Sequence, residues 1–134
     1  TYIPENPELL FGRARGYELD KQTALALQDV DLAIARNPAY GAAYLLRARL
    51  YRQSKQLDAA AADIDAALAN GIDEVAAGLE RGLIRFEMGN EAGALEDWQM
   101  IVATDRRADG SPGPAATAAS RFIAEVRAGA PTQP

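Results

Sequence analysis

The sequence predicts an all-α protein: three antiparallel helix pairs stacked as an α-solenoid with a right-handed superhelix, closed by a C-terminal capping helix. A period of 34 residues runs without insertion or deletion through most of the chain. Each period holds two segments with the apolar spacing of a helix, separated by a short polar turn. A period of about 34 residues is typical of two-helix solenoid repeats. One further amphipathic segment follows the third period and predicts the cap.

Residues at equivalent positions of the three periods define the repeat. These residues are Arg13, Arg47 and Arg81; Asp29, Asp63 and Asp97; Ala14, Ala48 and Gly82; Ala26, Ala60 and Ala94; and Val30, Ile64 and Trp98. A larger residue at the small positions would hold the two helices apart. We expect Trp98 to be buried. We also expect each ladder Arg to pair with a ladder Asp at a repeat junction, in its own repeat or the one before, because a charge near a packed seam is tolerated when it is paired.

Caps and turns predict the boundaries of the first four helices. Asn6 and Pro7 start the first, since a side-chain cap followed by Pro favours a helix start. The next two are expected at 23–36 and from near Ala39 to Gln53. Asp58 is expected to cap or open the fourth, which ends at Asn70-Gly71, a typical C-cap.

Caps and turns also predict the boundaries of the last three helices. Asp73 opens the fifth helix, and Gly89-Asn90 ends it and starts the sixth, which runs to about Thr104. Pro114 opens a seventh helix to Ala128, whose apolar side is expected on the sixth helix and whose charged side is expected in water. The predicted organisation is an extended arm at 1–6, repeats at 7–40, 41–74 and 75–106, a loop at 107–113, the cap at 114–129 and a disordered tail at 130–134.

The repeats resemble the tetratricopeptide repeat family over Pro7 to about Arg106. The matching residues are Leu10, Ala14, Tyr17, Ala26, Val30, Ala33 and Pro38, then Tyr44, Ala48, Tyr51, Ala60, Ile64 and Ala67, then Gly82, Ala94 and Trp98. The third repeat departs from the pattern at Gly78 and Arg85, which stand where the family has an aromatic residue and a Tyr. This departure predicts either looser packing or an Arg85 that reaches into a gap. The resemblance implies a module that binds other proteins on its concave face.

Composition limits the function classes. The length of 134 residues fits one domain, and a formal charge of −5 makes general nucleic-acid binding an unfavoured function. The absence of Cys and His excludes thiol nucleophiles, imidazole bases and the common zinc sites, and it fits both the cytoplasm and the periplasm. No apolar run approaches the ~20 residues of a membrane span. A start at Thr1 fits a shortened chain or a mature protein after signal removal.

The candidate partner-binding surface lies on the first helix of each pair. Its predicted residues are Phe11, Arg15, Leu45, Arg49, Arg52, Leu79, Leu83 and Phe86. They form an apolar row beside a row of arginines, which suits a peptide or protein segment with an apolar anchor and an acidic group. The other interpretation is that these are ordinary solvated or self-packed helix positions. We expect no catalytic residue, no metal and no cofactor.

The leading functional hypothesis is a non-enzymatic adaptor that binds a partner segment in its groove. A second hypothesis is a bacterial envelope or periplasmic assembly factor of the cytochrome-biogenesis or secretion type. A third is a regulatory or scaffolding part of a larger enzyme. The sequence leaves association between copies of the chain open.

Overall fold

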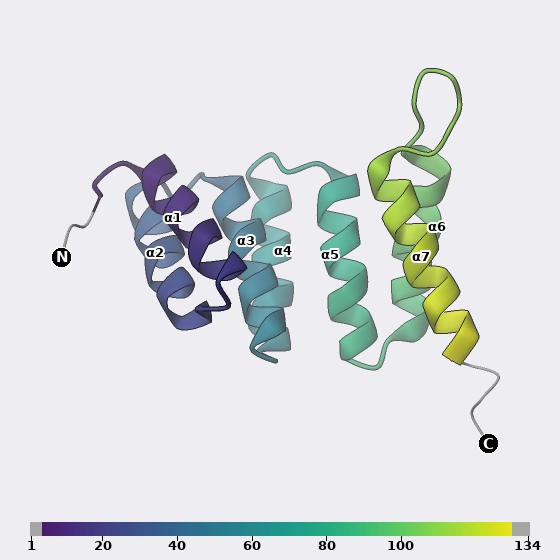
Figure 1. Ribbon diagram of the computed structural model, residues 1–134, viewed down its shortest axis with the longest axis horizontal. Coiled ribbons are helices and arrows are strands. Elements are labelled where there is room, and N and C mark those ends of the chain that lie inside the picture. Colours follow the sequence, from purple (N-terminus) through teal and green to yellow (C-terminus); the bar gives the residue numbers. More distant parts are fainter. Residues whose placement is uncertain (1–3, 130–134) are drawn as a thin grey trace. The chain divides into compact units, whose positions relative to one another are not determined.

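A computed structural model describes residues 4–129, and this part of the chain forms seven α-helices and no strand (Figure 1). The all-α prediction is therefore confirmed. The helices are α1 (Pro7–Leu19), α2 (Thr23–Arg36), α3 (Gly41–Gln53), α4 (Leu57–Ala69), α5 (Glu74–Glu87), α6 (Glu91–Thr104) and α7 (Pro114–Gly129). None of these helices is both long and apolar enough to cross a bilayer.

The chain divides into two compact units. Unit 1 comprises residues 1–72 and contains α1 to α4, and unit 2 comprises residues 73–134 and contains α5 to α7. Within each unit, helices that follow one another in the chain pack against each other. The predicted tail lies outside the described residues, and the predicted arm lies partly outside them. In the described part of the arm, Pro4 is buried and its carbonyl accepts a hydrogen bond from Arg36.

The core of unit 1 consists of small residues alternating with large ones. It contains Ala14, Ala26, Val30, Ala43, Leu46 and Leu50, all buried. Tyr17 and Tyr40 pack against this cluster from its edge. A Cβ added to Gly41 would lie 2.6 Å from the carbonyl oxygen of Asn70, so the start of α3 closely approaches the end of α4.

The turns inside the three helix pairs share one backbone conformation. Lys21, Lys55 and Gly89 follow one another at intervals of 34 residues, and their φ angles are 58°, 64° and 90°. A positive φ favours glycine, because a side chain in this region crowds the following carbonyl. Two of the three turns therefore hold a Lys in a conformation that costs it free energy.

The structure defines two helix starts more closely than the sequence does. Helix α3 begins at Gly41 instead of near Ala39, because the Asn37 side chain accepts from the Ala39 N–H and the Tyr40 N–H donates to the Asn37 carbonyl. Those bonds form a turn before the helix. Helix α4 begins at Leu57, so of the two roles expected for Asp58, capping or opening the helix, it has the second and lies in the first turn.

The core of unit 2 surrounds Trp98. Ala94, Trp98 and Ile101 of α6 are buried with Ala119 and Ile123 of α7. As predicted, α7 packs its apolar side on α6; it also contacts α5. Its charged residues Arg121, Glu125 and Arg127 are exposed.

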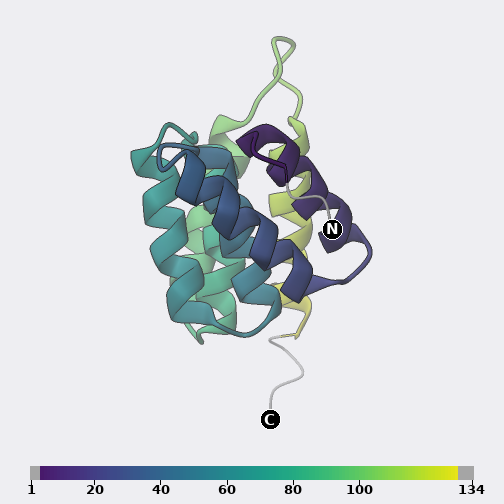
Figure 2. The same cartoon turned by 90° about the vertical axis from the view of Figure 1, so that its left-hand side faces the viewer.

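The loop between α6 and α7 projects beyond the ends of both helices (Figures 1 and 2). Asp105 anchors its base: the Asp105 carbonyl accepts from the Gly113 N–H at 2.8 Å, and its carboxylate accepts from the Ala116 N–H at 2.8 Å. At the tip, the Asp109 carboxylate accepts from the hydroxyl and the backbone N–H of Ser111, which lowers the pKa of Asp109.

Candidate functional site

Each ladder Arg forms a two-point ion pair with the ladder Asp 16 residues later. The shortest distances are 2.6 Å for Arg13–Asp29, 2.8 Å for Arg47–Asp63 and 2.9 Å for Arg81–Asp97. The predicted pairing is confirmed: each Arg reaches the Asp of its own repeat, one of the two expected partners, and the pair joins the two helices of that repeat rather than the junction between repeats. Arg47 also reaches Asp31 of the preceding repeat at 3.0 Å.

The ladder pairs have a structural role. Their Asp side chains are buried, and a buried carboxylate needs a cation or donors to offset its lost hydration. Hydrogen bonds from Arg47 to Asp63 raise the pKa of Arg47, outweighing the opposite effect of burial. The guanidinium of Arg13 also lies 5.9 Å from the Tyr17 ring centroid, and that of Arg47 lies 5.7 Å from Tyr51. The repeated Tyr thus covers the repeated Arg.

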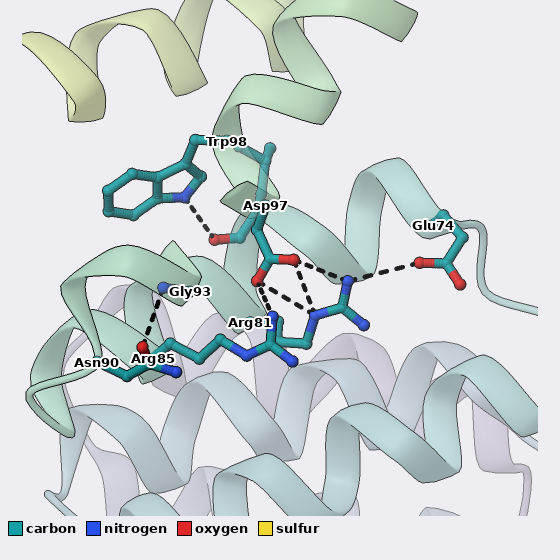
Figure 3. A network of polar contacts seen from close by, with 8 residues as sticks. Glu74, Arg81, Arg85, Asn90, Gly93, Asp97 and Trp98 are labelled. Carbon is teal, nitrogen blue, oxygen red and sulfur yellow. Dashed lines mark hydrogen bonds and ion pairs between the residues drawn. The ribbon is translucent and has the colours of Figure 1, made fainter. Parts of the chain in front are cut away.

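In the third repeat, a second arginine helps to neutralise the buried Asp. Arg85 replaces the Tyr and donates to the Asp97 carboxylate at 2.9 Å, so two guanidinium groups hold one buried carboxylate (Figure 3). Glu74 lies 3.6 Å from Arg81 on its other side. The interpretation that Arg85 reaches into a gap agrees with this geometry, and its target is Asp97.

Unit 1 brings four of the predicted site residues together. A groove of about 160 Å³ between α1 and α3 is lined by Phe11, Arg15, Ala42, Leu45, Leu46 and Arg49. A larger open cleft of about 680 Å³ adjoins it, and its lining residues are Arg15, Glu18, Leu19, Lys21, Thr23, Arg49 and Gln53. Arg15 and Arg49 belong to both linings, so the groove adjoins a cleft whose lining carries three basic side chains, Arg15, Lys21 and Arg49.

Arg49 and Arg15 differ in their contacts and in their exposure. Arg49 donates two hydrogen bonds to Glu18, at 2.5 and 2.7 Å. Burial raises the pKa of Glu18, but the hydrogen bonds and charge of Arg49, with smaller contributions from Gln53 and Arg15, outweigh it and lower the pKa overall. Arg15 is exposed, with its guanidinium 5.9 Å from the Phe11 ring centroid. A ligand carboxylate would therefore meet Arg15 more directly than Arg49.

The other predicted site residues lie apart from this groove. Arg52 is half-buried at the end of α3. Leu79 and Leu83 pack on the unit 2 core, and Phe86 is exposed beside Trp98 with ring centroids 6.4 Å apart. The sequence analysis did not predict the pairing of Glu18 with Arg49. The opposite charges on adjacent first helices were the available signal.

Comparison with known proteins adds no relative. No protein-family model matches the chain, and no curated protein matches it in sequence. Among residues 4–129, no group of three or more acidic side chains is placed to hold a metal ion. The function therefore has to be argued from the two units themselves.

Proposed function

We propose that this protein is a non-enzymatic interaction module built from tetratricopeptide-like helix pairs, and that unit 1 binds a partner segment between α1 and α3. The repeat assignment is supported by the buried small residues of the shared positions. It is also supported by the recurrence of one Arg–Asp pair at the same 16-residue spacing in all three repeats.

The observation that carries the binding proposal is the groove that joins Phe11 and Leu45 to Arg15. Phe11 and Leu45 are only partly buried, so an apolar side chain laid against them would remove further apolar surface from water. The guanidinium of Arg15 can hold a carboxylate through two parallel hydrogen bonds.

The spacing of these residues suggests the ligand. Phe11 and Arg15 lie one helical turn apart, which places their Cβ atoms about 5–6 Å from each other. In an extended peptide, residues i and i+2 point to the same side and lie about 6.6–6.8 Å apart. A segment of the form Leu-x-Glu therefore matches the groove, with Leu on Phe11 and Leu45 and Glu on Arg15.

The test uses a fluorescein-labelled Leu-x-Glu peptide in a Ser/Gly background, with Leu→Ser and Glu→Gln versions, measured by fluorescence anisotropy. We expect saturable binding of the parent peptide and weaker binding of both altered peptides. Arg15→Glu should weaken the parent about tenfold, because a charge-assisted hydrogen bond is replaced by repulsion. Leu45→Ala should weaken binding without changing its salt dependence.

Two further variants make this test specific. Arg127→Glu changes the same charge on the exposed side of α7 and should leave the affinity unchanged. Arg49→Glu is less suitable, because it would also break the ion pair with Glu18. A loss of binding by this variant could then come from a loss of stability. Equal affinity of Arg15→Glu and wild type, or equal affinity for all three peptides, would overturn the assignment of this site.

A further inference from the structure

The two units differ in charge. Residues 1–72 carry eight Lys and Arg against nine Asp and Glu, and residues 73–134 carry six against ten. Unit 2 thus holds −4 of the formal charge of −5. Electrostatic complementarity favours partners of opposite charge, so unit 2 favours basic segments more than unit 1 does.

Unit 2 has an apolar pocket of its own. The pocket measures about 290 Å³, and its lining residues are Leu83 and Phe86 of α5, Trp98 of α6, and Phe122, Glu125 and Val126 of α7. The ring centroids of Trp98 and Phe122 lie 5.3 Å apart. Pockets for cofactors and drug-sized ligands span about 300–1,000 Å³, so this one lies at the small end of that range and has room for a single large side chain.

The rings around this pocket are unequally buried. Trp98 is 1% exposed, whereas Phe86 is 42% exposed. The exposed part of Phe86 is apolar surface that a partner side chain can cover. Covering such surface removes it from water, which favours the complex.

The charged residue in the lining is acidic. The Glu125 side chain is 66% exposed and lies 3.9 Å from Arg121, and a loose pair of exposed charges contributes little to stability. The guanidinium of Arg121 lies 5.2 Å from the Phe122 ring centroid. Glu125 can therefore exchange Arg121 for a cation of a partner at little cost.

We propose that this pocket binds a segment of another protein that carries an aliphatic or aromatic side chain next to a Lys or Arg. The apolar side chain lies against Phe86 and Val126, next to the buried Trp98, and the neighbouring cation pairs with Glu125. This site is separate from the groove of unit 1 and prefers the opposite ligand charge. Its proposal does not rest on the proposed function of unit 1.

The test reads Trp98 directly. Trp98 is the single Trp of the chain, so its indole N–H gives one identifiable signal in a proton–nitrogen NMR spectrum of the full chain. The probes are the capped dipeptides acetyl-Leu-Lys-amide, acetyl-Leu-Glu-amide and acetyl-Gly-Lys-amide. We expect a saturable shift with Leu-Lys and about two- to fivefold weaker binding of Leu-Glu, the range that exposed ion pairs supply. Gly-Lys, which has no anchor, should give no shift.

Variants separate the two parts of the proposal. Glu125→Gln should remove the preference for Leu-Lys over Leu-Glu, and ~1 M salt should reduce it in the wild type. Phe86→Ala should weaken both Leu probes. Met100→Ala on α6, 61% exposed and outside the lining, is the control and should behave as wild type.

The proposal is overturned if Leu-Lys gives no saturable shift of the Trp98 signal, or if the wild type binds both Leu probes equally. It is also overturned if the preference persists in Glu125→Gln. Because the signal comes from Trp98 in unit 2, a failure here is distinct from a failure of the anisotropy test on unit 1.

Discussion

Gly82 of α5 lies directly against the indole of Trp98 on α6. A Cβ at Gly82 would be 2.7 Å from Cε2 and 2.8 Å from Cδ1 of Trp98, and closer still to Nε1. The first two repeats hold Ala14 and Ala48 at this position, opposite Val30 and Ile64. The third repeat therefore exchanges a methyl group on one helix for a larger ring on the other.

Gly82→Ala should destabilise the protein by about 1–3 kcal/mol, the usual cost of overpacking. Because Ala is normally the better helix former by about 1 kcal/mol, a loss of stability would identify the contact with Trp98 as its cause. Urea unfolding measures it. Gly12→Ala is the matched control: its added Cβ meets nothing within 4 Å, so the variant should be more stable than wild type. A stabilised Gly82→Ala would contradict the close fit.

Combining Gly82→Ala with Trp98→Ile should recover part of the loss, because it recreates the Ala48 and Ile64 pair of the second repeat. A double-mutant cycle in urea should then show a coupling free energy of about 0.5–3 kcal/mol in favour of the pair. Trp98→Ala by itself should cost about 3–5 kcal/mol, as expected for truncating a buried aromatic side chain. Additive losses in the cycle would show that the two positions are independent.

Arg47 allows a comparison of a buried and an exposed carboxylate on one cation. Asp63→Ala should destabilise the protein by about 1.5–3 kcal/mol, because it removes charge-assisted hydrogen bonds from a half-buried guanidinium. Asp31→Ala should cost about 0–1 kcal/mol, since Asp31 is 55% exposed. Thermal unfolding of the two variants measures both losses of stability. Equal losses would mean that burial does not set the strength of these pairs.

Glu18 predicts a dependence of stability on pH. Its pKa is lower in the folded state than its ordinary value, so its contribution is present above about pH 4.5 and is lost as the pH falls through the lowered pKa. Between about pH 5 and pH 3, the melting temperature of wild type should fall more steeply than that of Glu18→Gln. Arg49→Gln should flatten the curve in the same way, because Arg49 is the main cause of the lowering. Parallel curves for all three proteins would exclude this pair as a source of acid sensitivity.

Much of the fold could be predicted because residues of the same type recur at equivalent positions of all three repeats, where they have the same structural role. The Arg–Asp pairs, the buried small residues and the burial of Trp98 follow from phase alone. The candidate site was predicted in part: Phe11, Arg15, Leu45 and Arg49 share a lining, as their helix positions suggested. The engagement of Arg49 by Glu18 was missed, because it depends on how closely α1 and α3 approach.

The sequence by itself determined which segments are helical, which of their faces are apolar and which charges recur, because these properties depend on residue order and helical periodicity. Only the tertiary structure decided that the chain forms two compact units, that Gly82 accommodates Trp98 and that Arg85 joins Arg81 on Asp97. It also decided that Phe122 and Val126 complete a pocket with Phe86. Each of these depends on distances between side chains of different helices. A periodic pattern predicts the helix face on which a side chain lies, but it does not predict the distance from that side chain to the neighbouring helix.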